Sequence, residues 1–179
     1  MRRLTVRCIA PSVNADWAAC LFTLDDRRMK EPIDTQPPSD SSKTLAALEK
    51  LVSKKGITLG NMSSPDMTVT LAMASVCIPA NVALAENAVN QALRQWLDEE
   101  GAMLRIDHVE LRRTLIDMGY WQRDGFGRTY ERRPLPDDHP AREHVAVLES
   151  IEITRFVADA RARNEALRAQ RMAAHAQKS

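Results

Sequence analysis

Aromatic residues are scarce in this sequence, where phenylalanine, tryptophan and tyrosine together make up 4% of 179 residues. Strands favour aromatic and β-branched side chains, so their scarcity favours a helical core built from leucine, isoleucine, valine, methionine and alanine. Long hydrophobic runs are also missing, since no stretch approaches the roughly 18 apolar residues needed to cross a bilayer. We therefore expect a soluble, mainly helical protein that does not enter a membrane.

The sequence has few cysteines and almost no net charge. The chain has three cysteines, Cys8, Cys20 and Cys77, whose spacing fits neither a metal site nor a disulfide framework. It begins MRRLTVRC, without the apolar core of a secretion signal, so we expect a cytoplasmic location with reduced thiols and a buried Cys77. The formal net charge of +1 excludes a strong overall field that would attract nucleic acid or acidic lipid. Any such binding needs a local patch of charge.

Composition divides the chain into four parts. Residues 1–30 form an N-terminal extension whose apolar pattern fits a β-hairpin or a short helix, of which we favour the hairpin. Residues 31–43 (EPIDTQPPSDSSK) are rich in proline, serine and aspartate and predict a linker. Residues 44–133 contain the apolar patterns of one main domain, and residues 137–175 predict a single long C-terminal helix.

The first half of the main domain predicts two helices. Residues 44–55 place leucine and valine on one stripe and are followed by Gly56, a typical helix exit. A buried helix of about a dozen residues follows, with Ser64 able to cap it and Pro65 at the first helical position. Both helices would contribute to the core.

The second half predicts a helix pair and a hairpin. Residues 86–97 have apolar side chains at helical spacing, and residues 107–118 begin with a capping box and end before a glycine. The next residues, YWQRDGFGRTYERR, predict strands at 120–123 and 128–132 around an Asp-Gly-Phe-Gly turn. We therefore expect a mainly α fold with a small β-hairpin (α+β). It would be a winged-helix-like domain with a short N-terminal extension and a long C-terminal helix.

Three motifs of this domain occur in the order that one bacterial family shows. They are E-x-x-V-N at residues 86–90, D-H-V-E-L-R-R-T-L-I-D-M-G at residues 107–119 and R-D-G-F-G-R-T-Y at residues 123–130. Over about residues 70–133 the sequence resembles the bacterial family named domain of unknown function 2087. The resemblance implies a winged-helix module in a regulatory setting, without an established activity or catalytic residues. The sequence departs from the family at Ala88, where a second acidic residue is usual, and in a longer connection at residues 98–106.

The helix at 107–118 and the hairpin supply the candidate contacts to double-stranded DNA. Guanidinium groups of both elements could grip phosphates or read guanine edges. The candidate nucleic-acid-binding residues are Arg113, Arg123, Arg128, Arg132 and Arg133. The hairpin offers more positive than negative side chains and is the stronger part of the hypothesis.

A helical wheel limits what the helix itself can do. Arg112 falls between two apolar groups, Leu111 with Leu115 and Met118, and Val109 with Ile116, so we expect it to be a half-buried structural arginine. The outer face carries Arg113 against three acidic residues. This negative face argues against docking of the helix in an anionic groove. His108 falls on the inner side, which favours an interface histidine over a general base.

The predicted C-terminal helix combines an apolar stripe with basic residues. The candidate interaction residues on this helix are Phe156, Val157, Leu167, Arg163, Arg168 and Arg171. We expect the first half of the stripe to pack on the main domain, while the second half could bind a second copy, a partner protein or an acidic surface. A plain solvated face stays the alternative.

Catalytic and metal-binding patterns are not found. His139, Glu143 and His144 mix suitable ligand types, but their spacing is one residue longer than the inverted zinc motif H-x-x-E-H, so His139 fits better as a helix-entry residue. We expect no enzyme activity, metal or cofactor. The sequence predicts a non-catalytic winged-helix-like binding protein, a transcription-related DNA-binding or regulatory protein. The alternative is a protein-interaction or oligomerisation module without direct DNA binding.

Overall fold

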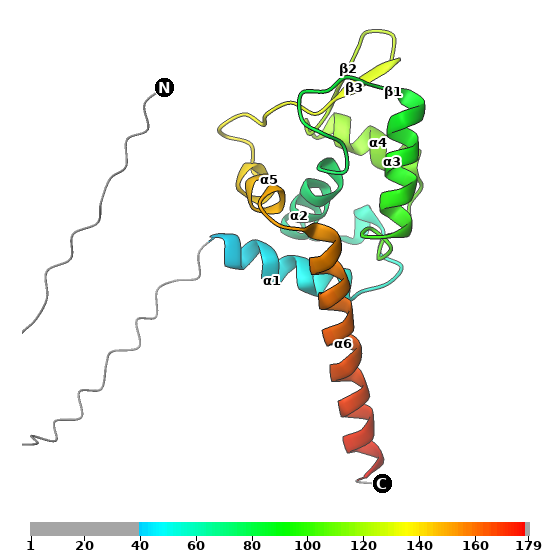
Figure 1. Ribbon diagram of the computed structural model, residues 1–179, viewed down its shortest axis with the longest axis vertical. Helices are drawn as coiled ribbons and strands as arrows, with labels where there is room; N and C mark the ends of the chain where they lie inside the picture. The colour runs from blue at the N-terminus through cyan, green and yellow to red at the C-terminus, as the bar shows by residue number, and fades with distance from the viewer. Residues whose placement is uncertain (1–39, 178–179) are drawn as a thin grey trace, which may run out of the picture. The chain divides into compact units, whose positions relative to one another are not determined.

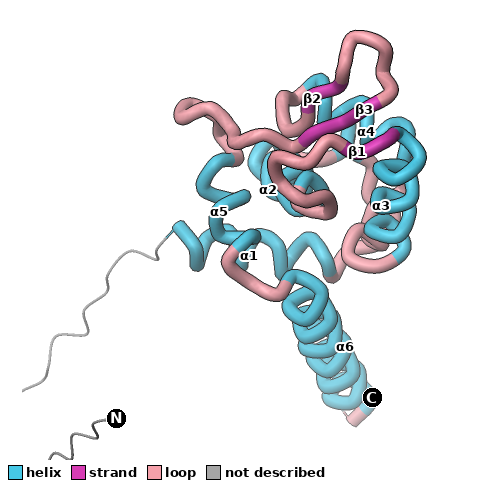
Figure 2. The backbone as a smooth tube through the Cα atoms, turned by 45° about the horizontal axis from the view of Figure 1, so that its top comes forward, coloured by secondary structure: helices cyan, strands magenta, loops and turns pink. Residues whose placement is uncertain are grey.

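A computed structural model describes residues 40–177 of the chain (Figures 1 and 2). This part is mainly helical with a small antiparallel sheet, so the predicted α+β class is confirmed. Its elements are α1 (Asp40–Val52), the 3-10 turn η1 (Leu59–Asn61), α2 (Ser64–Ser75), β1 (Leu84–Ala85), α3 (Glu86–Asp98), α4 (His108–Asp117), β2 (Gln122–Arg123), β3 (Thr129–Glu131), α5 (Arg142–Glu149) and α6 (Ile153–Ala176). The predictions for residues 1–30 and 31–39 lie outside the described residues.

Helix α1 begins earlier than the sequence predicts. Residues 40–43, which we predicted to be linker, form its first turn, and Gly56 lies beyond its end in a left-handed conformation at φ 69°. The face that contains Thr44, Leu48 and Leu51 is buried. Packing of this face against α2, α5 and α6 extends the helix into a segment whose polar composition predicts a linker.

Helix α2 forms the centre of the core. It has 12 residues, as predicted, and all residues from Val69 to Ser75 are buried. The helix cap is Ser63, whose Oγ accepts a hydrogen bond from the backbone N–H of Asp66, so the predicted cap at Ser64 is wrong by one residue. Pro65 is accepted in the first turn because its missing N–H would have no helical partner there. Helices α1 and α5 pack against α2.

Helices α3 and α4 and the three strands lie together at one end of the described region (Figure 2). The strand order is β1-β3-β2, with both pairs antiparallel. Asp107 caps α4, since its Oδ1 accepts from the backbone N–H groups of Val109 and Glu110 at 2.8 Å. Gly119 follows α4 with a φ of 80°, which confirms the predicted glycine exit. Strand β1 was not predicted, because two residues carry no periodic pattern.

The prediction of one continuous C-terminal helix is wrong. Residues 150–152 separate α5 from α6, and the two helices run in different directions (Figure 1). The Ser150 hydroxyl donates to the Val147 carbonyl at 2.7 Å, a local bond of the kind that competes with helix continuation. The break lets α5 pack on α1 and α2 while α6 crosses α1 and continues beyond the other elements.

Candidate functional site

Arg112 joins α3, α4 and the sheet. Its guanidinium donates to Oε1 of Glu86 at 2.7 Å and to Oδ1 of Asn90, and it lies 5.1 Å from the ring centre of Tyr130. Only 11% of the Arg112 side chain is exposed. All four residues belong to the three motifs described above, so these motifs meet in one structural cluster. The prediction of a structural Arg112 is confirmed.

The tip of the β2–β3 hairpin is a tightly bonded loop. Asp124 Oδ1 accepts from the backbone N–H groups of Arg128 at 2.6 Å and Thr129 at 3.3 Å, and Gly127 adopts a φ of 69°. Desolvation raises the pKa of Asp124, but the backbone hydrogen bonds at this loop and the charge of Arg128 together outweigh it, so the pKa lies below its usual value. Phe126 is 81% exposed at the tip, and the Arg128 guanidinium lies 4.7 Å from its ring centre.

Four of the five predicted nucleic-acid-binding arginines are exposed: Arg113, Arg123, Arg128 and Arg133. The prediction that the fifth arginine, Arg132, is available to nucleic acid is wrong, because its side chain is buried. It is 8% exposed, its Nε donates to the Ile78 carbonyl at 3.1 Å, and its Nη1 donates to Glu149. Side chains alternate along a strand, so Arg132 points inward as the buried Tyr130 does. This two-residue period was available in the sequence.

The outer face of α4 is acidic, as the helical wheel predicts. Arg113 is accompanied by Asp107, Glu110 and Asp117, all exposed. Hydrogen bonds from the backbone N–H groups at Glu110 and Val109 lower the pKa of Asp107, so its negative charge persists well below neutral pH. Met118 is 44% exposed, so its prediction as an inner-face residue is wrong.

On the hairpin, two arginines are already paired. Arg133 contacts Glu131 at 3.0 Å and Arg128 contacts Asp124 at 3.8 Å, whereas Arg123 pairs with no carboxylate of the part that the structure describes. These are exposed pairs whose arginines can exchange partners at little cost. Arg123 and Arg128 are therefore the hairpin arginines most available to an external anion.

Helix α6 has a bound half and an exposed half. Val157 is 2% exposed and belongs to the core, and Phe156 is half-buried beside it, as predicted for the first part of the stripe. Arg163 pairs with Glu49 of α1 at 2.9 Å, and Arg168 donates at 3.0 Å to the carbonyl of Ser53, the residue that follows α1.

The interaction surface predicted on this helix is therefore smaller than the sequence indicates. Val157 is buried and is removed from it. Leu167, at 49% exposure, and Arg171 remain on the surface, and Met172 joins them at 75% exposure. The signal for Met172 was weak in the sequence, because the apolar stripe thins toward the end of the helix.

The three described histidines of the sequence hypotheses have protein partners. His139 Nδ1 accepts from the Ala141 N–H at 3.1 Å and its Nε2 donates to the Met118 carbonyl, so it secures the entry to α5 as predicted. His144 Nδ1 contacts Thr44 Oγ1 at 2.8 Å, and His108 Nε2 lies 3.1 Å from an Arg94 guanidinium nitrogen. Within residues 40–177 no group of three or more histidine, cysteine or acidic residues is placed to hold a metal ion.

The motifs that meet at Arg112 lie within a segment that matches a known family. Residues 63–132 match DUF2087, described as an uncharacterized protein conserved in bacteria. The resemblance stated from the sequence is thus confirmed for this segment. The DUF2087 segment begins at the cap of α2 and ends at the buried Arg132, so it contains the whole Arg112 cluster. No curated protein and no solved structure matches the chain.

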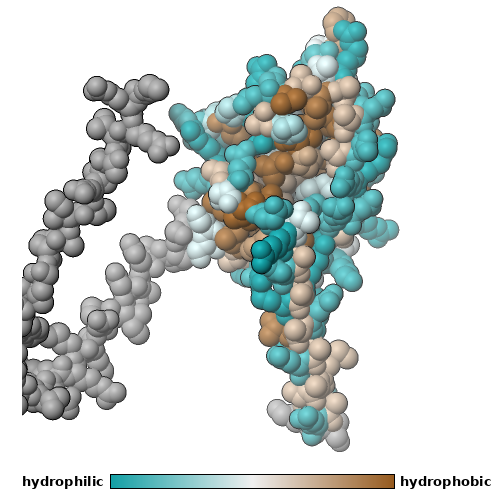
Figure 3. Space-filling model, viewed as in Figure 1, coloured by the Kyte–Doolittle hydropathy of each residue, from teal (hydrophilic) through white to brown (hydrophobic). Residues whose placement is uncertain are grey.

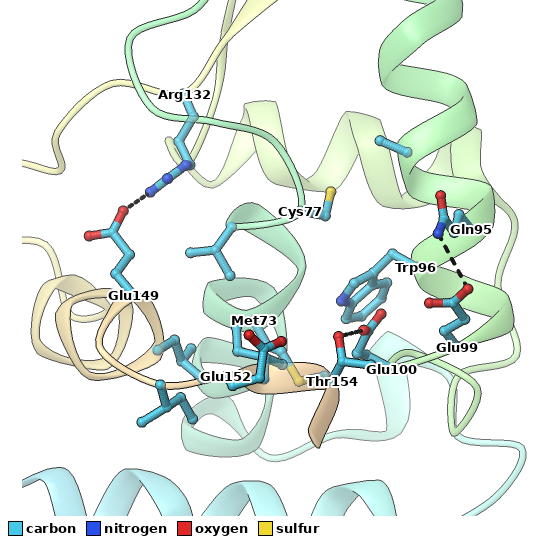
Figure 4. A pocket seen from close by; sticks show the side chains of 15 residues that line it. Met73, Cys77, Gln95, Trp96, Glu99, Glu100, Arg132, Glu149, Glu152 and Thr154 are labelled. Atoms are coloured by element: carbon cyan, nitrogen blue, oxygen red, sulfur yellow. Dashed lines mark hydrogen bonds and ion pairs between the residues drawn. The ribbon is translucent and has the colours of Figure 1, made fainter. Parts of the chain in front are cut away.

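The DUF2087 segment also forms part of a cavity of about 640 Å³ that sequence reasoning missed (Figure 4). Residues of α2, of α3 and of the loops that follow these helices line one part of it, and Arg132, the end of α5 and the start of α6 line the rest. Burial raises the pKa of Cys77 in this cavity to about 12, so its thiol stays neutral and is no nucleophile at physiological pH. Figure 3, which is viewed from the same side as Figure 1, shows hydrophobic side chains gathered in the middle of the visible face, with hydrophilic ones around them.

No helix of the described range is both long enough and apolar enough to cross a membrane.

Proposed function

We propose that the chain is a non-catalytic cytoplasmic regulatory protein that contacts double-stranded DNA through the tip of its β2–β3 hairpin. The observation that carries the proposal is the tip itself, where Phe126 and Arg128 stack on each other in the solvent above a loop fixed by Asp124. A planar cation beside an exposed ring suits both phosphates and base edges. Arg123, which pairs with no described carboxylate, adds a second cation.

The order of elements supports a winged-helix-like interpretation of the segment. Helix α2 is followed by β1, the helix pair α3 and α4, and the hairpin β2–β3, whose inner strand pairs with β1. In such an arrangement the hairpin projects as a wing beside the second helix of the pair. Function still depends on the site and not on the fold, because winged helices also serve as protein-contact platforms.

Electrostatics favour the hairpin over α4 as the contact. The exposed arginines of the two elements, Arg113, Arg123, Arg128 and Arg133, stand against the acidic residues Asp107, Glu110, Asp117, Asp124 and Glu131. A face with more carboxylates than guanidinium groups gains little from phosphate neutralisation. The hairpin has three exposed arginines against two acidic residues, whereas α4 has one exposed arginine against three acidic residues, so the proposal places the hairpin tip against the duplex and keeps α4 at the edge of the contact.

The test is titration of a labelled 20-base-pair duplex with the full chain, followed by fluorescence anisotropy at several salt concentrations. We expect affinity to fall as salt rises, and the double variant Arg123→Ala with Arg128→Ala to weaken binding similarly for unrelated sequences. Loss of two phosphate contacts should reduce the slope of log affinity against log salt by about 2.

The matched control is Arg105→Ala with Arg155→Ala, which removes the same charge from exposed positions outside the hairpin and α4. It should leave the slope nearly unchanged. Equal weakening by both pairs would mean that overall charge is responsible and would contradict a hairpin contact. Absence of binding at low salt would remove the DNA proposal.

A second candidate is protein interaction through the distal half of α6. Leu167 and Met172 are the two large apolar side chains that this helix leaves exposed, and Met172 lies beyond Arg168, whose guanidinium donates to the Ser53 carbonyl. A second copy could cover them with the same residues of its own helix. Light scattering should show a dimer that Leu167→Ser with Met172→Ser converts to a monomer. A monomeric wild-type chain would contradict self-association through α6.

A further inference from the structure

The cavity beside α3 contains a hydrogen-bond donor without an acceptor. Trp96 is 4% exposed, and its indole Nε1 has no hydrogen-bond partner within the described residues. In Figure 4 the indole nitrogen points toward the open space between Cys77 and Glu152. Buried N–H groups in native proteins are almost always paired with protein, water or ligand. An acceptor from outside the described chain is therefore expected at this position.

The orientation of the indole ring is fixed by Gly101. A Cβ atom at Gly101 would lie within 2.8 Å of three carbons of the six-membered ring of Trp96, so this close approach requires glycine. The Gly101 N–H also donates to the Trp96 carbonyl at 2.7 Å. Packing of the six-membered ring on the Gly101 backbone leaves the nitrogen-bearing ring toward the cavity, so the donor is held in place and cannot turn to another partner.

Acidic side chains dominate the charge of the cavity. Its lining contains Glu99, Glu100, Glu149 and Glu152, with Arg132 as the single basic residue. Glu149 binds Arg132, and Glu100 accepts a hydrogen bond from the Thr154 hydroxyl at 2.6 Å. Arg161 lies near but donates to the backbone carbonyls at 99 and 100, not to their carboxylates. The surplus negative charge, next to an indole ring, attracts a cation.

Apolar side chains form the bed of the cavity. They are Met73, Val76, Ala92, Leu148, Ile151 and Ile153. The neutral thiol of Cys77 adds to this surface. The volume of about 640 Å³ lies within the usual range of roughly 300–1,000 Å³ for small-molecule sites. An apolar body of the ligand would cover these residues, with polar groups at its ends.

We propose that this cavity binds a small organic cation that consists of an apolar chain with an ammonium group and a hydrogen-bond acceptor. The ammonium faces Glu152 and its acidic neighbours, the chain covers the apolar bed, and the acceptor receives the N–H of Trp96. This site does not depend on the proposed DNA contact. It uses the same α3 that the Arg112 cluster holds, but a different face of it.

Calorimetric titration of the full chain with simple amino alcohols tests the proposal. The probes are 4-amino-1-butanol, 6-amino-1-hexanol and 8-amino-1-octanol, compared with the neutral 1,6-hexanediol and the anionic 6-hydroxyhexanoate. We expect at least one amino alcohol to bind about tenfold more tightly than the diol, and the anion to bind most weakly. In nitrogen-15 NMR spectra the indole N–H resonance of Trp96, assigned by its loss in Trp96→Phe, should shift on saturation.

Two matched variants sharpen the test. Glu152→Gln should weaken the amino alcohol roughly three- to tenfold and leave the diol unchanged, whereas Glu165→Gln, an exposed residue of α6 outside the cavity, should change neither. Glu152 is exposed, so its variant tests binding without a risk to folding. The proposal is overturned if no amino alcohol binds more tightly than the diol, if Glu152→Gln has no effect, or if the Trp96 resonance stays unshifted at saturation.

Discussion

Arginine is frequent both in the DUF2087 segment and in α6, but the two regions use it differently. In the segment, Arg112 and Arg132 point inward and bind acceptors from other elements. In α6, Arg163 binds Glu49 of α1 and Arg168 binds the residue that follows α1, both at the surface, while Arg171 stays in solvent. The role of an arginine is therefore decided by the acceptors that packing brings near it, and not by the residue type alone.

The difference has a physical cause. A guanidinium group carries five N–H donors, so burial is tolerated only where several acceptors meet it. In the segment Glu86 and Asn90 are preorganised on one turn of α3, and β3 places Tyr130 against the same group. On α6, Arg163 and Arg168 are exposed and each makes a single contact with the described part of the chain, at the surface. Substitutions should therefore separate the two regions by their stability effects.

The largest effect should come from Arg112→Met. The variant leaves Glu86 and Asn90 without the group that binds them and separates α3 from α4, so the free energy of unfolding should fall by about 3 kcal/mol. Urea denaturation followed by circular dichroism measures it. The control is Arg113→Ala at the exposed neighbouring position, which should lower the free energy of unfolding by less than about 0.5 kcal/mol. Equal effects of the two variants would contradict the structural role of the cluster.

Gly101→Ala should have the next largest effect. A methyl group there overlaps the Trp96 ring, and overpacking of this kind costs about 2 kcal/mol in unfolding free energy. Trp96 fluorescence should change with it, because the ring must move. Gly60→Ala is the control, since no atom lies within 4 Å of the added Cβ and the backbone is not left-handed. Thermal unfolding of both variants is the measurement, and an unperturbed Gly101→Ala would show that the ring is free to move.

Within α6, Val157→Ala and Leu167→Ala should divide the helix into its two halves. Val157 is 2% exposed, so loss of two methyl groups should cost about 1.5 kcal/mol. Leu167 is 49% exposed, so Leu167→Ala should change the free energy of unfolding of the monomer by less than about 0.5 kcal/mol. Chemical denaturation at low protein concentration separates these effects from self-association. A large effect at Leu167 would mean that the distal half also packs on the body.

The smallest effect should appear at Asp107 and depend on pH. Hydrogen bonds from the backbone N–H groups of Glu110 and Val109 lower its pKa in the folded chain. The stabilising contribution is therefore complete above the unfolded pKa of about 3.9 and disappears as pH falls through the lower folded value. Asp107→Asn keeps a capping acceptor but cannot titrate, so it should lose less stability than the wild type between pH 5 and 2. Parallel pH profiles of the two proteins would exclude this role.

Local patterns predicted most of the elements. The helices at 64, 86 and 107 begin within a residue or so of the expected positions, because caps, prolines and glycines act over one turn. The inward position of Arg112 followed from the helical wheel of α4. The break at residues 150–152, the two-residue β1 and the cavity could not be predicted, because each depends on contacts between segments far apart in the chain.

The sequence by itself determined the helical class, the turn chemistry around Asp124 and Gly127, and the inward position of Arg112 on α4, since these follow from residues a few positions apart. The tertiary structure alone decided which partners the arginines meet, placing Arg132 against Glu149 and leaving Arg123 free of described carboxylates. It also brought the α3 residue Trp96 beside acidic residues of α5 and the α5–α6 connection. The side chain of each residue fixes its charge and hydrogen-bonding capacity, but packing decides which partners satisfy them.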